Sequence, residues 1–179
     1  MAKSPLKKST ARSVALVGIM AATVECGKLA LAAIPNVEVV TILLALYGYI
    51  FGIYGVIAAF VFVSIEPLIY GFNTWVVSYY LYWPLVPLVF MILARFCVKN
   101  RFILAGAAVL MTAWFGVLTS LVDIGLFSGA FDNFWYRFSI YYARGAVFYI
   151  TQIVCNAVLF VFSFKFLADK LSRVKKNLI

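Results

Sequence analysis

The chain has 179 residues, of which 66% are hydrophobic and only 12% are charged, and its formal net charge is +9. No soluble core of this size can bury that much apolar surface, so the sequence predicts an integral membrane protein. The absence of histidine excludes imidazole metal sites and histidine-based catalysis. The three cysteines stand singly, without a C-x-x-C pair, and we expect buried free thiols.

Six apolar stretches follow one another along the chain. A helix needs roughly 20 apolar residues to cross about 30 Å of hydrocarbon, and the first stretch has that length without the cleavage signature of a removed signal peptide. Gly48, Gly52 and Gly55 predict a tight hairpin between the second and third stretches, and Pro84 and Pro87 are expected to bend the fourth. We expect spans at about 12–34, 39–51, 54–70, 75–96, 102–126 and 141–166.

The basic residues indicate the orientation of these spans. Positively charged residues mark cytoplasmic segments, so we expect both termini in the cytoplasm, and we attribute the charge to topology and lipid headgroups rather than to nucleic acid. The sequence therefore predicts one all-α domain over residues 1–179, a six-transmembrane-helix bundle in a bacterial plasma membrane. Twelve of the fifteen basic residues form three clusters, Lys3, Lys7, Lys8 and Arg12, then Arg95, Lys99 and Arg101, then Lys165, Lys170, Arg173, Lys175 and Lys176.

The remaining charges lie mostly in the outer half of the predicted bundle. Glu25 and Lys28 stand three residues apart inside the first apolar stretch, and Glu66 lies far along the third. Ionisable residues within a span face a cavity or pair with one another. Two interpretations therefore stay open: a polar pocket that opens outward, and structural ion pairs such as Glu25 with Lys28 or Glu66 with Arg144.

Aromatic residues crowd the same half of the bundle. An interfacial belt accounts for some of them, but the cytoplasmic side has no comparable cluster. We expect the others to line a pocket for a flat or ringed molecule. Gln152 and Asn156, one turn apart on the last span, are expected to form hydrogen bonds between helices. The candidate residues for the pocket and its gating loops are Glu25, Lys28, Asn36, Glu38, Glu66, Tyr70, Tyr79, Trp83, Arg137 and Arg144.

Small residues recur on one face of the first span, at Ala11, Ala15, Gly18 and Ala22. Such a stripe allows another helix to approach closely in lipid. The sequence leaves open whether the stripe packs inside the bundle or docks on a partner protein.

These features together resemble the substrate-binding S component of energy-coupling factor (ECF) vitamin transporters. The resemblance covers essentially the whole chain and is most specific in residues 34–41, where the sequence reads Ile-Pro-Asn-Val-Glu-Val-Val-Thr. It implies a high-affinity vitamin-binding subunit of an ABC importer, which captures its substrate from outside and topples in the membrane to release it inward. Further matching segments are 47–52, 66–72 and 80–84.

The resemblance also implies the partners and the substrate class. The small-residue stripe would dock on a transmembrane T component that joins two ABC-type ATPases, so this chain is expected to be neither an enzyme nor the carrier of a metal or a covalent cofactor. The subgroup that it resembles suggests cobalamin, bound without a histidine ligand to cobalt. The alternatives are a deazapurine precursor of queuosine and pantothenate, an anion that Lys28, Arg137 or Arg144 would neutralise.

Three other classes of protein agree less well with the sequence. An autonomous channel or ion-coupled carrier needs polar residues through the full depth of the membrane, or inverted repeats with broken helices, whereas the inner halves of these spans are mainly apolar. A membrane enzyme needs a nucleophile with its base or a set of metal ligands, and the sequence has neither pattern. A scaffold or assembly factor is the third alternative.

Overall fold

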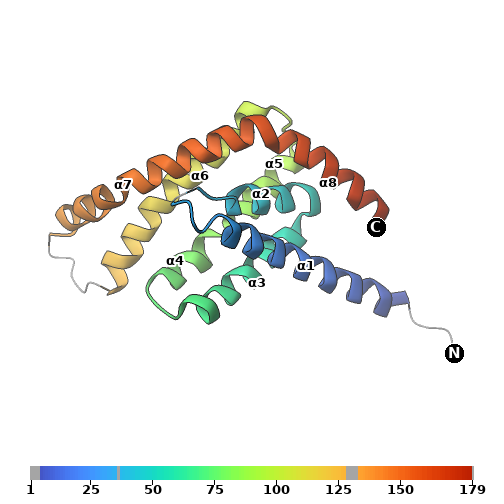
Figure 1. Ribbon diagram of the computed structural model, residues 1–179, viewed down its shortest axis with the longest axis horizontal. Helices are drawn as coiled ribbons and strands as arrows, with labels where there is room; N and C mark the ends of the chain where they lie inside the picture. Colours follow the sequence, from blue (N-terminus) through green and yellow to red (C-terminus); the bar gives the residue numbers. More distant parts are fainter. Residues whose placement is uncertain (1–4, 36, 128–132, 179) are drawn as a thin grey trace.

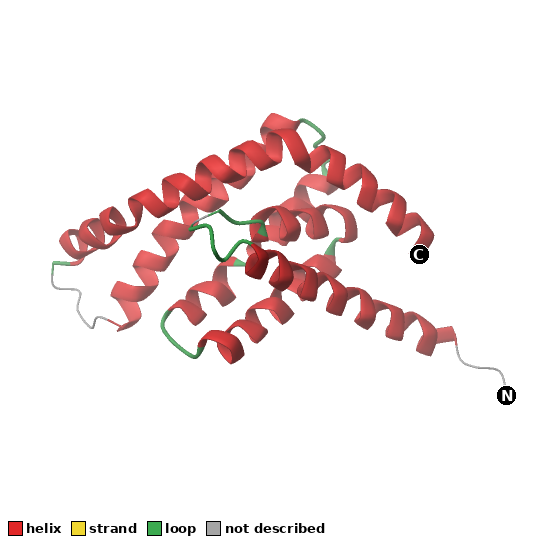
Figure 2. Ribbon diagram, in the orientation of Figure 1, coloured by secondary structure: helices red, strands yellow, loops and turns green. Residues whose placement is uncertain are grey.

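The computed structural model describes residues 5–35, 37–127 and 133–178; it is 87% helical, and no strand occurs in these residues. The predicted all-α class is therefore confirmed. Figures 1 and 2 show helices packed around a short central helix, with the start of α1 and the end of α8 toward the same end of the molecule. The elements are α1 (Pro5–Ala30), α2 (Val40–Phe51), α3 (Ile53–Tyr70), α4 (Trp75–Tyr82), α5 (Leu85–Arg95), α6 (Arg101–Val122), the π-helical turn η1 (Asp123–Phe127), α7 (Phe134–Leu159), the π-helical turn η2 (Phe160–Phe164) and α8 (Lys165–Leu178).

Five helical segments in the described residues are long and apolar enough to cross a membrane. Of the six expected spans, α2 is too short to cross a membrane, because its 12 residues rise only ~18 Å along the helix axis. Several long apolar helices thus fit a multi-pass membrane protein, whereas six complete crossings and two cytoplasmic termini stay predictions. The five segments are Thr10–Ala30, Ile53–Tyr70, Trp75–Arg95, Arg101–Leu126 and Phe134–Lys176.

The core of the bundle is centred on α2. Ten of its 12 residues are buried, and Leu44, Ala45 and Leu46 are almost completely inaccessible. A helix that is apolar on all sides is stable only where neighbours cover every face. Helices α1, α3, α5 and α8 pack against α2 and provide that cover, so the short second apolar stretch is an interior helix.

Glycines allow α2, α3 and α5 to approach to backbone contact. A methyl group added at Gly48 would lie 2.0 Å from the carbonyl oxygen of Pro87 in α5, and one added at Gly55 would lie 2.5 Å from the backbone nitrogen of Gly48. Between α2 and α3 the chain turns at Gly52, whose φ of 63° is a left-handed conformation that glycine adopts without strain. The predicted tight hairpin is confirmed.

We predict that Gly48→Ala destabilises the bundle by about 1–3 kcal/mol, the usual cost of overpacking a well-packed interior. The added methyl group has no room, because its nearest neighbours are backbone atoms of Pro87. Gly106→Ala is the matched control, since nothing lies within 4 Å of a methyl group at that position on α6. Thermal unfolding in detergent should show a lower midpoint for Gly48→Ala alone. Equal midpoints for the two variants would contradict the close contact.

Three of the predicted spans differ from the helices in the structure. The first was expected to continue to Ile34, but α1 ends at Ala30 and the chain then makes turns. The fourth is interrupted rather than only bent, because α4 ends at Tyr82 and α5 begins at Leu85, and the ring of Pro84 cannot supply the N–H that a continuous helix requires. The sixth was expected to begin at Tyr141, but α7 begins at Phe134. From there α7, η2 and α8 form one bent rod along the side of the molecule (Figure 1).

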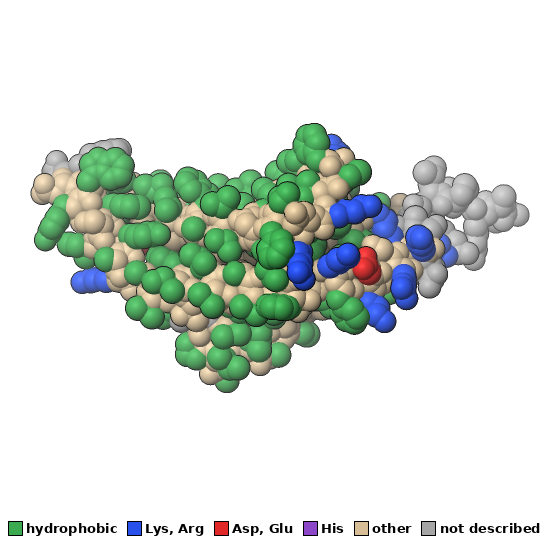
Figure 3. All heavy atoms as spheres, turned by 90° about the horizontal axis from the view of Figure 1, so that it is seen from above, with side chains coloured by type: hydrophobic (Ala, Val, Ile, Leu, Met, Phe, Trp, Pro, Cys, Tyr) green, Lys and Arg blue, Asp and Glu red, His purple; other side chains and the backbone are tan. Residues whose placement is uncertain are grey.

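The surface of the molecule is largely apolar. Large hydrophobic side chains are exposed on α6 and α7, among them Leu110, Trp114, Val147 and Ile150. In Figure 3 hydrophobic side chains cover most of the visible face, and basic side chains gather toward the end of the molecule where α8 ends. An apolar surface of this extent fits contact with lipid tails.

Candidate functional site

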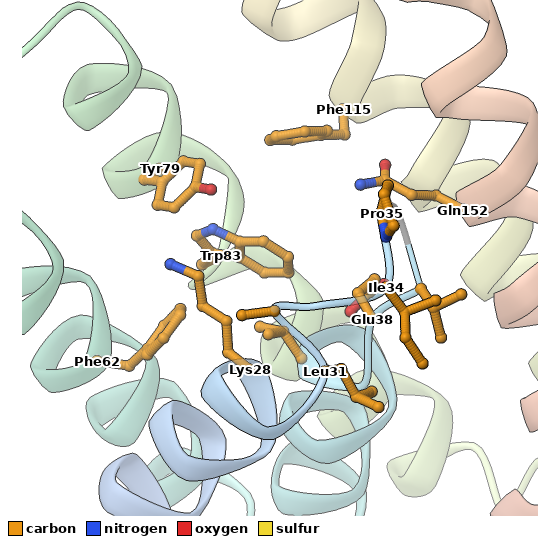
Figure 4. Close-up of a pocket in the computed structure, with 13 residues that line it drawn as sticks. Lys28, Leu31, Ile34, Pro35, Glu38, Phe62, Tyr79, Trp83, Phe115 and Gln152 are labelled. Carbon is orange, nitrogen blue, oxygen red and sulfur yellow. The ribbon is translucent and has the colours of Figure 1, made fainter. Parts of the chain in front are cut away.

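A cavity of about 230 Å³ lies between the end of α1, the α1–α2 connection and the middle of α6 and α7. Figure 4 shows aromatic side chains of α3 and α4 on one side of it, and the α1–α2 connection with Gln152 of α7 on the other. Apolar groups predominate, and a few polar groups converge among them, as is typical of small-molecule sites. The lining residues are Lys28, Leu31, Ala32, Ile34, Pro35, Val37, Glu38, Val40, Phe62, Tyr79, Trp83, Phe115 and Gln152.

The α1–α2 connection forms one wall of this cavity. After α1 ends, the chain makes tight turns, in which the N–H of Ile34 donates to the carbonyl of Leu31 at 2.9 Å, and Pro35 then prevents further helix. Irregular backbone within a membrane protein is stable only where protein covers it or where it lines a polar cavity. The connection is thus suited to a binding site. Asn36, a predicted site residue in this segment, lies outside the described residues.

The carboxylate of Glu38 fixes the start of α2 and also lines the cavity. It accepts hydrogen bonds from the backbone N–H of Thr41 at 2.9 Å, from the hydroxyl of Thr41 at 2.6 Å and from the side-chain amide of Asn156 at 2.8 Å. An anion at a helix N-terminus is favourable, because the helix dipole is positive there. Asn156 also donates to Thr112 of α6 at 2.9 Å, which confirms its predicted interhelical role. A carboxylate has about four acceptor positions, and three of them are occupied by groups of the described residues.

A cluster of polar side chains surrounds Lys28 near the end of α1. The ammonium group of Lys28 forms an ion pair with Glu66 of α3 and lies 4.2 Å from the ring centre of Tyr70. Glu66 is 1% exposed, and Glu25, 8% exposed, interacts electrostatically with both Glu66 and Lys28. Glu66 therefore has its cationic partner on α1, whereas both carboxyl oxygens of Glu25 are buried without a hydrogen-bond partner in the described residues. The alternative pair of Glu66 with Arg144 does not form, since Arg144 is exposed on α7.

Aromatic rings form the wall opposite the α1–α2 connection. The ring centres of Tyr79, Trp83 and Phe115 lie 5.7 to 6.2 Å from one another, and Phe62 lies 6.1 Å from Trp83. Tilted and edge-to-face rings at such distances attract one another and form a rigid surface. The buried indole N–H of Trp83 has no acceptor within the described part of the chain. A ligand acceptor at that point would remove the cost of the missing hydrogen bond.

Most of the predicted pocket residues come together in this region. Lys28, Glu38, Tyr79 and Trp83 line the cavity, whereas Glu25, Glu66 and Tyr70 interact with Lys28 but are not part of the lining. Two other predicted site residues, Arg137 and Arg144 of α7, are not part of the cavity lining.

Nine of the thirteen lining residues were not among the predicted site residues, and three of these nine come from α3, α6 and α7 rather than from the segment 31–40. Phe62 and Phe115 lie in the middle of apolar spans, where nothing in the pattern distinguishes a pocket side chain from a core or lipid-facing one. Gln152 was expected to bond to another helix, but its side chain lines the cavity. An uncharged amide in the middle of a span was the available signal for it, because polar groups there face a partner or a cavity.

The small-residue stripe lies on the free face of α1. Ala11, Ala15, Gly18 and Ala22 are all exposed, whereas Met20 on the opposite face is buried. Nothing lies within 4 Å of a methyl group built on Gly18. The stripe therefore does not pack inside this bundle, which removes one of the two interpretations that the sequence left open.

The cysteines are free, but the expectation that all are buried was wrong. Cys155 is half-buried, whereas Cys26 and Cys97 are exposed. Cys26 lies on the outward face of α1, and Cys97 lies in the turn after α5, so neither is covered by a neighbouring helix. No group of three or more side chains suited to hold a metal ion occurs in the residues that the structure describes.

No family model, curated protein or solved structure matches this chain. The proposal for its function therefore rests on the cavity, on the free face of α1 and on the resemblance carried by the sequence.

Proposed function

We propose that this chain is the substrate-binding S component of an ECF-type importer in a bacterial membrane. It captures a small vitamin from outside and passes it inward after docking on an energising module. The observation that carries the proposal is the cavity, in which an aromatic wall faces an irregular segment of backbone with a fixed carboxylate. This arrangement suits the recognition of a ringed molecule by stacking and hydrogen bonds.

The free face of α1 supports the second part of the proposal. A helix that exposes only small side chains along one stripe can be approached closely by a partner helix. The stripe and Lys28 lie on different faces of α1, so a partner docked on the stripe leaves the cavity unobstructed. The partners under this proposal are a transmembrane T component and two ABC-type ATPases, which supply ATP hydrolysis.

The size of the cavity bears on the choice of substrate. Its volume of about 230 Å³ lies below the range of roughly 300–1,000 Å³ that is common for sites of drug-sized ligands. A corrinoid such as cobalamin is much larger, so the cavity favours the smaller candidates. Between these, the aromatic wall and the carboxylate of Glu38 favour a flat heterocycle with hydrogen-bond donors, such as a deazapurine, over the acyclic anion pantothenate.

We predict that Gln152→Leu weakens ligand binding about fivefold, because it removes a polar contact of roughly 1 kcal/mol in the cavity while keeping the side-chain volume. The lining position of Gln152 on α7 makes this contact available. Titration of the purified chain with its ligand measures the change.

Thr151→Val is the control for this experiment. The hydroxyl of Thr151 bonds to the carbonyl of Val147 within its own helix, and Thr151 is not part of the cavity lining. We expect Thr151→Val to bind like the unmodified chain. Equal weakening by both variants, or by neither, would contradict the assignment of Gln152 to the site.

A further inference from the structure

A second cavity, of about 560 Å³, lies away from the vitamin site, where α8 passes the end of α2 and the turn between α5 and α6. Its polar lining is basic: Lys99 comes from that turn, and Lys175 and Lys176 come from α8, together with the hydroxyl of Ser172. No carboxylate belongs to its lining in the described residues. Asp169, two turns before Lys176, is exposed and is not part of the lining, although its charge acts on Tyr49 of the lining.

Hydrogen bonds between distant segments hold the walls of this cavity. Lys175 donates to the carbonyl of Ile50 at 2.6 Å, and this carbonyl belongs to the last turn of α2, where helical carbonyls lack partners within the helix. Tyr49 donates its hydroxyl proton to the carbonyl of Val98 at 2.8 Å. The two bonds join α2 to α8 and to the α5–α6 turn, so the cavity is part of the fold.

Two of the three lysines remain available to a ligand. Lys175 is occupied by the carbonyl of Ile50, but Lys99 and Lys176 are exposed, and neither forms an ion pair in the described part of the chain. Two ammonium groups and a hydroxyl at the rim of one cavity form a site for a phosphate group, since lysine binds phosphate as a point charge.

The position of the cavity indicates where such a phosphate comes from. Helix α8 continues the long apolar helix α7. One side of α8, which includes Ala168, is buried, and Lys170 and Arg173 lie on its exposed side. Figure 3 shows the basic side chains gathered at this end of the molecule, next to the apolar surface. A basic pocket at the edge of an apolar, lipid-facing surface is where the headgroup of an anionic lipid lies.

We propose that this cavity binds the phosphate headgroup of an acidic phospholipid, with Lys99 and Lys176 as the charged contacts and Ser172 as a hydrogen-bond donor. The bound lipid bridges α8 to the α5–α6 turn. The acyl chains of the lipid lie along the apolar surface beside the cavity.

Native mass spectrometry of the full chain in neutral detergent tests this proposal, with palmitoyl-oleoyl phosphatidylglycerol and phosphatidylcholine as the probes. We expect phosphatidylglycerol to remain bound and phosphatidylcholine to be lost. The double variant Lys99→Gln/Lys176→Gln should bind phosphatidylglycerol about 30-fold more weakly, since each basic side chain near an anionic headgroup contributes about 1 kcal/mol. Lys175 stays unchanged because it supports the fold.

The matched control is Lys170→Gln/Arg173→Gln, which removes the same charge from exposed positions of α8 outside the lining. We expect it to retain phosphatidylglycerol. Equal loss in both double variants would overturn the site in favour of general surface attraction. Displacement of the lipid by millimolar inorganic phosphate would overturn the lipid as the occupant and assign the cavity to a soluble anion.

Discussion

Gly18→Leu is expected to abolish transport in cells that contain the complete importer, while the purified chain keeps its ligand affinity. The large side chain would project from the free face of α1 and prevent a partner helix from approaching closely. The fold should not change, because nothing lies within 4 Å of a methyl group at position 18. Uptake of labelled substrate and titration of the purified variant measure the two quantities separately.

Gly106→Leu provides the control for this prediction. It makes the same change at an exposed glycine of α6 that also has no neighbour within 4 Å, but away from the stripe. We expect normal uptake and normal binding from Gly106→Leu. If Gly18→Leu transported normally, or if it lost binding together with transport, the docking role of the stripe would be wrong.

Lys28→Met is expected to destabilise the bundle by about 3–5 kcal/mol, the cost of leaving a buried charge without its partner. Glu66 is 1% exposed and forms its ion pair with Lys28, and the adjacent Glu25 is also buried. Removing the ammonium group therefore leaves the buried carboxylate of Glu66 between α1 and α3 without its cation. Equilibrium unfolding in mixed micelles measures the change in free energy.

Lys28→Met/Glu66→Gln separates the loss of the charge pair from the loss of the lysine side chain. Neutralising Glu66 removes the uncompensated charge, so we expect the double variant to recover most of the stability that Lys28→Met loses. A double variant that is no more stable than Lys28→Met would show that the ion pair does not connect α1 to α3 energetically.

The sequence predicted features that depend on local chemistry. Glycines at 48, 52 and 55 predicted close packing because only glycine permits backbone contact. Pro84 and Pro87 predicted a bend in the fourth span, which the structure divides into α4 and α5. The length of the second apolar stretch already showed that it was short for a span. It did not show that α2 is covered on every side, because this depends on how the other helices are placed.

Features that depend on helix rotation were predicted less well. Lys28 pairs with Glu66, whereas the i, i+3 spacing suggested Glu25 as its partner and Arg144 was considered for Glu66. Phe115 and Gln152 reach the cavity from the middle of α6 and α7, and in a span that is apolar all round the sequence does not indicate which side faces inward. The charged residues and the aromatic cluster that contains Tyr79 and Trp83 were therefore predictable, whereas Phe62, Phe115 and Gln152 were not.

The most direct test of the proposed function is to identify the small molecules released from the chain after purification alone in mild detergent. Mass spectrometry should find a ring-containing vitamin or vitamin precursor, and calorimetry should show that it rebinds tightly and one-to-one without any partner protein. A corrinoid would keep the function and overturn the argument from cavity size. If no molecule is released and no member of a vitamin panel binds, the substrate-binding account is contradicted, and a channel or scaffold becomes the better interpretation.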